Sequence, residues 1–404
     1  MLRSYVSFAA RGDVARESAK AAILRRPWQA ALLVCYFIQK ASFLHLCESS
    51  IQSVLLWIPS SSSRICRSNP PCYATICRQP LFHILLFIAF LFISCHRPTL
   101  LDLPPATILV GSHDSPYLSL VDVRTAHIIG TIPSGGTGYT ALAVDNSNSR
   151  AYVALTTQNT ISVIDLNHKT ILASIAIAPS PIDIALAPKQ DRLYVSCLGA
   201  QSVYAINTTT CIVEEEYPVG FGPICIGVTP DGHYLYVAKK SEMEVAVIDL
   251  GNLRNSTTIS IDTAPWSVRV APDGLYVYVG SVSSDIVTII DVNTNTVRRH
   301  IRVAPYPHAI AFNATGRWAF VACNESNIVS VIDVLTGSLK GSVKVGIYPI
   351  DLAASDDGRW LYVSNFRENT LSVVDAETLR EVGKISVGAH PIGLSSLPPP
   401  ASVH

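Results

Sequence analysis

The chain has 404 residues, 30 basic and 30 acidic side chains and a formal net charge of zero, a length that is ample for a sizeable core. The charge is unevenly divided, since residues 1–95 carry ten basic and three acidic side chains and the remainder carries 20 and 27. A groove that follows phosphates needs clustered basic residues. The acidic balance of the larger part therefore disfavours a nucleic-acid-binding protein.

Residues 1–79 do not read as a folded domain. They mix Ser, Cys, Pro and Arg without a helical or strand period, and six of the ten cysteines of the chain lie before residue 96. We expect this part to have little order, or to lie upstream of a true translation start near residue 77.

Residues 80–95 (PLFHILLFIAFLFISC) form an apolar run of about 14 residues, too short for a transmembrane helix of ~20. Arg78 before the run and Ser94-Cys95 after it are typical of a secretory signal. The FISC stretch resembles a bacterial lipoprotein cleavage site, although Phe92 stands where Leu or Val is usual; an uncleaved anchor is the alternative. We expect a mature chain that starts after Ser94, lies outside the cytoplasm and reaches its folded domain through a linker at 96–105.

From about residue 106 the sequence repeats with a period of 42. An aromatic-Val pair recurs at Tyr152-Val153, Tyr194-Val195, Tyr236-Val237, Tyr278-Val279, Phe320-Val321 and Tyr362-Val363. A proline recurs at Pro181, Pro223, Pro265, Pro307, Pro349 and Pro391. An acidic residue follows an apolar run at Asp165, Asp249, Asp291, Asp333 and Asp375, with Asn207 in the remaining copy. With an earlier copy that is one residue longer there are seven units, and a period of this length with strand-type residues indicates a propeller.

Each unit resolves into four short strands bounded by Gly, Pro, Asn or Asp turn signals. The fourth strand has one apolar face and one face of small residues, as expected where the blades crowd around the axis. The chain therefore runs second, third, outer and inner strand. We predict an all-β, seven-bladed propeller over 106–397, in which the inner strand at 392–397 closes the first blade, followed by a tail at 398–404.

The recurring YVAL, YVSC, YVAK, YVGS and YVSN, with the following VID and the VGxxP turn, resemble the YVTN family of seven-bladed propellers, which includes YncE-like proteins. The resemblance covers about 106–397 and implies the fold. It implies function only loosely, because propellers host unrelated activities.

The channel at the ring's centre is the first candidate site. A column of small residues on the inner strands is broken by Arg269, and the column two residues earlier holds Asp183 and Asp351. We predict that these three side chains ring the channel mouth and bind a polar or anionic ligand, with Arg269 as the principal contact. In the alternative, Arg269 pairs with a nearby acid and plugs the channel.

The turns between outer and inner strands should also converge on the channel mouth. Their aromatic residues are Tyr139, Phe221, Trp266, Tyr306, His308, Tyr348 and His390. These residues are expected to form a binding surface, with Trp266, Tyr306, His308, Tyr348 and His390 as the site residues. Alternatively, Trp266 and His308 fill an inter-blade position that is isoleucine elsewhere. His308 and His390 lie on opposite sides of the repeated proline and do not repeat a ligand position, so no metal site is expected.

Nucleophile, Walker, dinucleotide and metalloprotease motifs are absent.

Cys197 and Cys225 fall on adjacent blades, where they form either a disulfide or two packed thiols. The Lys239-Lys240 pair is expected to lie in a solvated loop.

We expect a monomeric, extracytoplasmic binding or scaffold module without a cofactor. Its partner would be a small polar or anionic ligand or another envelope protein, and its contact with the membrane would be made by the N-terminal segment. The alternative is a propeller enzyme similar to lactonases, lyases or dehydrogenase subunits; no catalytic residue of these can be carried over, because no motif matches beyond the repeat.

Overall fold

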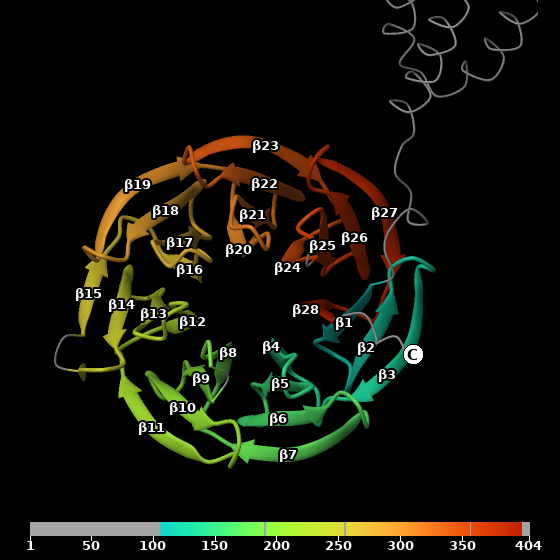
Figure 1. The fold of residues 1–404 in the computed structure, drawn as a ribbon, viewed down its shortest axis with the longest axis horizontal. Helices are drawn as coiled ribbons and strands as arrows, with labels where there is room; N and C mark the ends of the chain where they lie inside the picture. The colour runs from blue at the N-terminus through green and yellow to red at the C-terminus, as the bar shows by residue number, and fades with distance from the viewer. Residues whose placement is uncertain (1–105, 190, 254–255, 356, 398–404) are drawn as a thin grey trace, which may run out of the picture. The chain divides into compact units, whose positions relative to one another are not determined.

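A computed structural model describes residues 106–189, 191–253, 256–355 and 357–397. The described residues form 28 strands in seven four-stranded antiparallel sheets, which surround a central axis as the blades of a propeller (Figure 1). The predicted seven-bladed, all-β fold is therefore confirmed. Among the described residues, no helix is long and apolar enough to cross a bilayer. The predictions for 1–79, 80–95, 96–105 and 398–404 fall outside the described residues.

The blades are numbered from the N-terminal end of the repeats, and each is given from its inner to its outer strand. Blade 1 comprises β28 (Pro391–Leu397), β1 (Thr107–Ser112), β2 (Tyr117–Asp122) and β3 (His127–Pro133). Blade 2 comprises β4 (Tyr139–Asp145), β5 (Arg150–Leu155), β6 (Thr160–Asp165) and β7 (Thr170–Ala176). Blade 3 comprises β8 (Pro181–Leu186), β9 (Arg192–Cys197), β10 (Ser202–Asn207) and β11 (Val213–Pro218).

The remaining four blades follow the same order of strands. Blade 4 comprises β12 (Pro223–Val228), β13 (Tyr234–Lys239), β14 (Glu244–Asp249) and β15 (Thr257–Ser260). Blade 5 comprises β16 (Pro265–Val270), β17 (Tyr276–Ser281), β18 (Ile286–Asp291) and β19 (Thr296–Arg302). Blade 6 comprises β20 (Pro307–Phe312), β21 (Trp318–Cys323), β22 (Ile328–Asp333) and β23 (Ser338–Lys344). Blade 7 comprises β24 (Pro349–Ala354), β25 (Trp360–Asn365), β26 (Thr370–Asp375) and β27 (Arg380–Ser386).

The last strand of the chain closes the ring as the sequence predicts. β28 pairs antiparallel with β1, with Thr107 opposite Leu397 and Val110 opposite Leu394. The inner strands β4, β8, β12, β16, β20, β24 and β28 surround the axis, and each contacts the inner strands of its two neighbours (Figure 1). The inner-strand residues that are not packed in the core between blades are therefore the candidates to line the centre of the ring.

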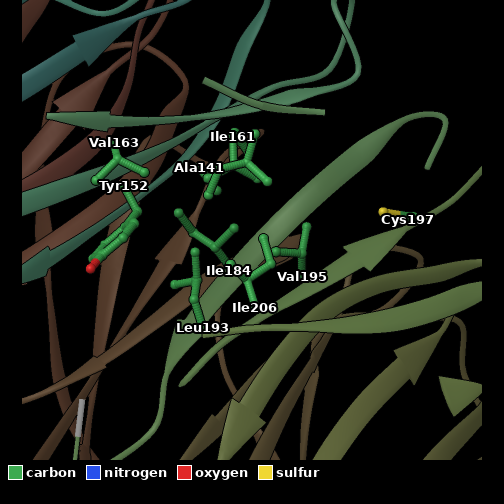
Figure 2. Packing of buried hydrophobic residues seen from close by; sticks show 11 residues of the cluster. Ala141, Tyr152, Ile161, Val163, Ile184, Leu193, Val195, Cys197 and Ile206 are labelled. Carbon is green, nitrogen blue, oxygen red and sulfur yellow. The ribbon is translucent and has the colours of Figure 1, made fainter. Parts of the chain in front are cut away.

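The apolar core lies between consecutive blades. Figure 2 shows the layer between blades 2 and 3, where Tyr152 and Val163 of blade 2 pack with Ile184 and Leu193 of blade 3. Both faces of a blade are covered by its neighbours, so the middle strands are apolar on both sides instead of alternating cleanly. Cys197 is a fully buried free thiol in this layer. It packs as a small apolar residue, and neither it nor Cys225 forms a disulfide.

The recurring acidic residue has a local structural role. Asp165 ends the third strand of blade 2, and its Oδ1 accepts hydrogen bonds from the backbone N–H groups of Asn167 and His168, at 2.8 Å each. Asn207 makes the same pair of bonds to Thr209 and Thr210 in blade 3. An Asp or Asn that bonds its own backbone two and three residues on fixes a tight turn. Because these carboxylates accept the hydrogen bonds of their own turns, we do not count them among the candidate ligand-binding residues.

Candidate functional site

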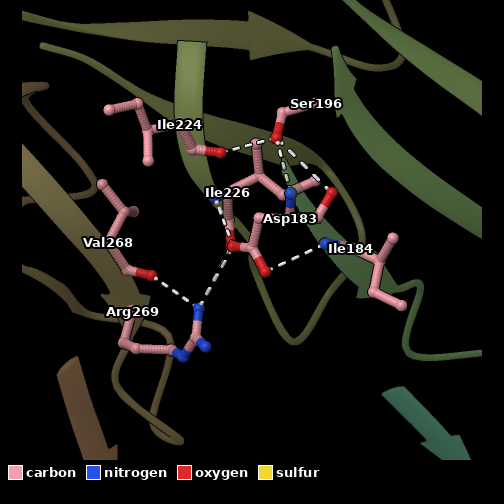
Figure 3. A network of polar contacts seen from close by, with 7 residues as sticks. All are labelled: Asp183, Ile184, Ser196, Ile224, Ile226, Val268 and Arg269. Carbon is pink, nitrogen blue, oxygen red and sulfur yellow. Dashed lines mark hydrogen bonds and ion pairs between the residues drawn. The ribbon is translucent and has the colours of Figure 1, made fainter. Parts of the chain in front are cut away.

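Asp183 joins the inner strands of blades 3 and 4. A register shift between Pro181 and Asp183 disturbs the pairing of β8 with β9, and the Asp183 carboxylate then accepts hydrogen bonds from the N–H of Ile184 at 2.9 Å and from that of Ile226 on β12 at 3.0 Å. Ser196 on β9 completes the arrangement, because its Oγ bonds Asp183 N and donates to Ile224 O (Figure 3). Asp183 is 7% exposed, so it fastens two blades together instead of facing the channel freely.

Blade 7 repeats this arrangement. Asp351 accepts a hydrogen bond from Leu394 N on β28 at 2.9 Å, and Ser364 Oγ bonds Asp351 N at 3.0 Å and donates to Ile392 O. We call each set an Asp-Ser fastener. The sequence contains a signal for the fastener that our sequence analysis did not use. The second strand has serine, at Ser196 and Ser364, only where the inner strand has aspartate 13 residues earlier, at Asp183 and Asp351. In the other five units the pairs are Ala141 with Ala154, Cys225 with Ala238, Ser267 with Gly280, Ala309 with Ala322 and Gly393 with Gly111.

Arg269 on β16 reaches from blade 5 past blade 4 to blade 3. Its Nη1 lies 3.7 Å from Asp183 Oδ2 and donates to the carbonyls of Val268 at 3.1 Å and Ile226 at 3.5 Å (Figure 3). Among the described residues, its Nε and Nη2 have no hydrogen-bond partner, and the side chain is 41% exposed. The guanidinium is thus held by one nitrogen, and two donors stay free for a ligand.

The structure brings Arg269 and Asp183 into contact and leaves Asp351 apart from them. The three groups still influence one another electrostatically. Burial raises the pKa of Asp351 to about 6, against the opposing effect of the Arg269 charge. Burial alone would lower the pKa of Arg269, but the carboxylates of Asp183 and Asp351 raise it overall. Burial, reinforced by Asp183, also raises the pKa of the Cys225 thiol well above its usual value, so this cysteine is a neutral thiol and not a nucleophile.

Tyr139 is the second departure from the repeat at the centre. It replaces the recurring proline in blade 2 and is 1% exposed on β4, so the prediction that it joins the aromatic turns was wrong. Its ring leans toward blade 1, where a Cβ on Gly393 would lie 2.8 Å from Tyr139 Cζ and closer still to the hydroxyl oxygen. Blade 1 thus has Gly393 where blades 3 and 7 have the aspartate of a fastener. The Tyr139 hydroxyl occupies the space that a side chain at Gly393 would take, and it has no hydrogen-bond partner among the described residues.

Trp266 and His308 lie together at the start of β16 and β20. Their ring centroids are 5.2 Å apart, and Lys240 Nζ lies 4.6 Å from the Trp266 ring. His308 Nδ1 donates to Ile350 O on β24 at 3.1 Å, and burial lowers the pKa of His308 to about 4. His308 is therefore neutral at pH 7 and joins blades 6 and 7. Both residues occupy the inter-blade position that is Ile182, Ile224, Ile350 and Ile392 elsewhere.

Tyr306, Tyr348 and His390 share one strained backbone position, immediately before the repeated proline. Their φ angles are 61°, 62° and 53°, in the left-handed region. Blades 2 and 4 use Gly138 and Gly222 at this position. A side chain in this region costs about 1–2 kcal/mol relative to the ordinary helical region, a penalty that glycine escapes.

The expectation that Lys239 and Lys240 both lie in a solvated loop was wrong for Lys239. It ends β13 and is 5% exposed, with its ammonium paired to Glu242 and, at 3.1 Å, to Glu244; only Lys240 of the pair is exposed. Across 106–397, apart from the few undescribed positions, no group of three or more His, Cys, Asp or Glu is arranged to hold a metal ion.

Comparison with known proteins agrees with this architecture. The family model described as lactonase, seven-bladed beta-propeller matches residues 121–344, more than half of the chain. The chain belongs to this family. The comparison with curated proteins finds no match.

Solved propellers share the fold at low sequence identity. A putative 6-phosphogluconolactonase from Bacteroides uniformis is 13% identical with a TM-score of 0.60, covering 72% of this chain and 99% of its own. Hydrazine synthase from Kuenenia stuttgartiensis is 20% identical with a TM-score of 0.59, covering 65% and 90%. Apo AztD from Citrobacter koseri is 13% identical with a TM-score of 0.57, covering 73% and 98%. These likenesses support the fold of this lactonase-family propeller and leave its chemistry to its own residues.

Proposed function

We propose that this lactonase-family propeller binds a small anionic, polyhydroxylated ligand at the centre of the ring, with Arg269 as the principal contact. The supporting observation is that only Nη1 of its guanidinium is engaged, while Nε and Nη2 lack partners among the described residues of a 41% exposed side chain. Two parallel donors suit the two oxygens of a carboxylate or phosphate. The Asp351 carboxylate, on the inner strand of blade 7, would accept hydrogen bonds from ligand hydroxyls.

Asp183 has a different role in this proposal. Asp183 is 7% exposed and its Oδ2 lies 3.7 Å from Arg269 Nη1, so it positions Arg269 instead of contacting the ligand. Blade 7 provides an internal comparison: its fastener has the same geometry, but the position two blades further on, where Arg269 stands relative to Asp183, is Ala143. An Asp-Ser fastener therefore does not need an arginine, and a role in ligand binding accounts for Arg269 better than a role in folding.

Replacing Arg269 tests the proposal. We expect Arg269→Ala to weaken the binding of 6-phosphogluconate, measured by calorimetry, at least tenfold, because the loss of a charge-assisted bidentate contact costs at least ~1.4 kcal/mol. The melting temperature should change little, since alanine occupies this position in four other blades. Arg269→Lys should give an intermediate affinity.

Arg298→Ala is the matched control, an arginine of the same blade that is 45% exposed. Unchanged affinity in Arg269→Ala, or a large drop in melting temperature, would refute the proposal.

Two further features belong to the proposal. The in-register YV, VID and proline positions support placing the chain with YVTN-type, YncE-like proteins within the family. The apolar run at 80–95, with its basic flank and small-residue exit, supports export and a binding role at the cell envelope.

Hydrolysis of a sugar lactone is the second candidate, favoured by the pKa of Asp351, which burial raises to about 6. In this reaction the Asp351 carboxylate would take a proton from water as the water oxygen attacks the lactone carbonyl carbon. Arg269 would donate to the developing oxyanion. The ring C–O bond then breaks as protonated Asp351 returns the proton to the departing ring oxygen, which gives a hydroxyl and a carboxylic acid that ionises to the carboxylate. We expect the rate of 6-phosphogluconolactone hydrolysis to rise with pH through about 6 and to be lost in Asp351→Asn. A rate equal to that without protein would exclude this candidate and leave the binding proposal intact.

A further inference from the structure

A collar of turns lies at one end of the ring. In six of the seven blades, all but blade 5, the residue before the repeated proline lies against the turn between the second and third strands, as shown by Phe366 N bonding Tyr348 O at 2.9 Å. Its own N–H bonds the preceding blade: Tyr348 N and His390 N donate to Asn327 Oδ1 and Asn369 Oδ1, at 2.9 Å each, and Tyr306 N donates to Ser284 O at 3.0 Å. The backbone of these three residues is therefore held by hydrogen bonds that do not involve their own side chains.

The side chains at this position differ between the two halves of the ring. Blades 2, 3 and 4 have Gly138, Ser180 and Gly222, whereas the consecutive blades 6, 7 and 1 have Tyr306, Tyr348 and His390 in the same left-handed conformation. A bulky residue is disfavoured there and glycine is not. Strain that the fold does not require is characteristic of a functional surface.

The three residues, together with Phe366, form a partly exposed aromatic platform. Tyr306 is 46% exposed and has no ring contact among the described residues. The Phe366 ring lies 6.1 Å from that of Tyr348, and it stacks on His390 with a centroid distance of 4.6 Å and an interplanar angle of 24°. The platform therefore spans three consecutive blades, with Arg367 over one face of the Tyr348 ring and Phe366 against one face of His390, so that a ligand would stack on the opposite face of each.

Around Tyr348 and His390 the charges nearly cancel. Asp114 bonds both His113, at 2.7 Å, and His390. Glu368 pairs with Lys384 at 2.8 Å, and the one cation without an acidic partner among the described neighbours is Arg367, 3.9 Å from the Tyr348 ring centroid. A single-stranded nucleic acid requires a positive groove beside its stacking rings. A neutral ligand that has apolar faces and hydrogen-bonding groups fits this surface better.

We propose that the aromatic platform binds a neutral oligosaccharide, whose sugar rings stack on Tyr306, Tyr348 and His390. Aromatic rings with polar edges offer apolar area and hydrogen bonds at a low entropic cost, and Arg367, Asp114 and the Tyr306 hydroxyl are available at the edges for sugar hydroxyls. This site is separate from the channel site and does not depend on Arg269.

The test uses the full chain and a panel of neutral hexasaccharides, namely cellohexaose, chitohexaose, maltohexaose and mannohexaose. We expect at least one to bind by calorimetry and Tyr306→Gly to weaken its affinity about tenfold. The same variant should melt about 2 °C higher, because glycine relieves the strain. Tyr306→Ala should lose affinity without that gain. A residue that only supports the fold would not lose function while gaining stability.

Two controls separate the platform from the backbone and from the channel. Ser180→Gly relieves the same backbone conformation in blade 3, where φ is 57°; it should raise the melting temperature and leave affinity unchanged. Arg269→Ala should leave hexasaccharide affinity unchanged, so this proposal and the channel proposal fail independently. Absence of binding by all four hexasaccharides, tighter binding of a dT12 oligonucleotide, or full affinity in Tyr306→Gly would overturn the inference.

Discussion

A chain that ends at Val387 is expected to lose cooperative folding. The truncation removes β28, so β1 loses its inner partner and the pairing of Val110 with Leu394. It also removes Leu394, 7% exposed, from the core cluster that contains Ile108, Val110 and Tyr362. One buried leucine contributes about 2 kcal/mol, and with the lost strand pairing the deficit reaches roughly 5 kcal/mol, comparable to the whole stability of a domain.

The measurement is solubility and thermal unfolding of the truncated chain. A chain that ends at Leu397 is the matched control, because it lacks 398–404 but retains all of β28. We expect this control to melt like the full chain and the shorter chain to aggregate or to unfold over a broad range, since its open ring exposes two blade faces and unpaired strand edges. Equal stability of both chains would contradict closure by the last strand.

Gly393→Ala is expected to destabilise the fold by about 2–3 kcal/mol, although it adds a single methyl group. The new Cβ would lie 2.8 Å from Cζ of Tyr139 and closer to its hydroxyl oxygen. Tyr139 is 1% exposed and its ring is enclosed between blades 1 and 2, so it has little freedom to withdraw. The φ of Gly393 is not in the left-handed region, so the effect would be due to crowding and not to backbone strain.

Two variants separate this crowding from a general sensitivity of the inner strands. Ser267→Ala in blade 5 alters the matching position, where the hydroxyl is buried without a partner among the described residues, and it should cost nothing. In a Tyr139→Ala background, the cost of Gly393→Ala should fall to near zero, as a double-mutant cycle on chemical denaturation would show. An undiminished cost in that background would mean that Tyr139 does not set the requirement for glycine.

The sequence by itself determined the architecture. A period of 42 residues with four strand signals per unit fixes the blade, because each unit can bury its two faces only against copies of itself. The offset of the first unit also predicted that Leu397 and its neighbours would close blade 1, as β28 does. The same periodicity located the centre of the ring, because a break such as Arg269 in a column of small residues is visible without coordinates.

What each of these residues contacts depended on the tertiary structure. Asp183 and Arg269 are separated by 86 positions, and only the arrangement of three successive blades places them 3.7 Å apart and turns the carboxylate toward a backbone N–H of the next blade. The burial of Tyr139 was not evident either, because a turn residue in the sequence gave no indication of a neighbouring blade with a glycine at Gly393. Repeats specify the contacts that recur in every blade, whereas a contact made in only one or two blades depends on distances between residues that are remote in sequence.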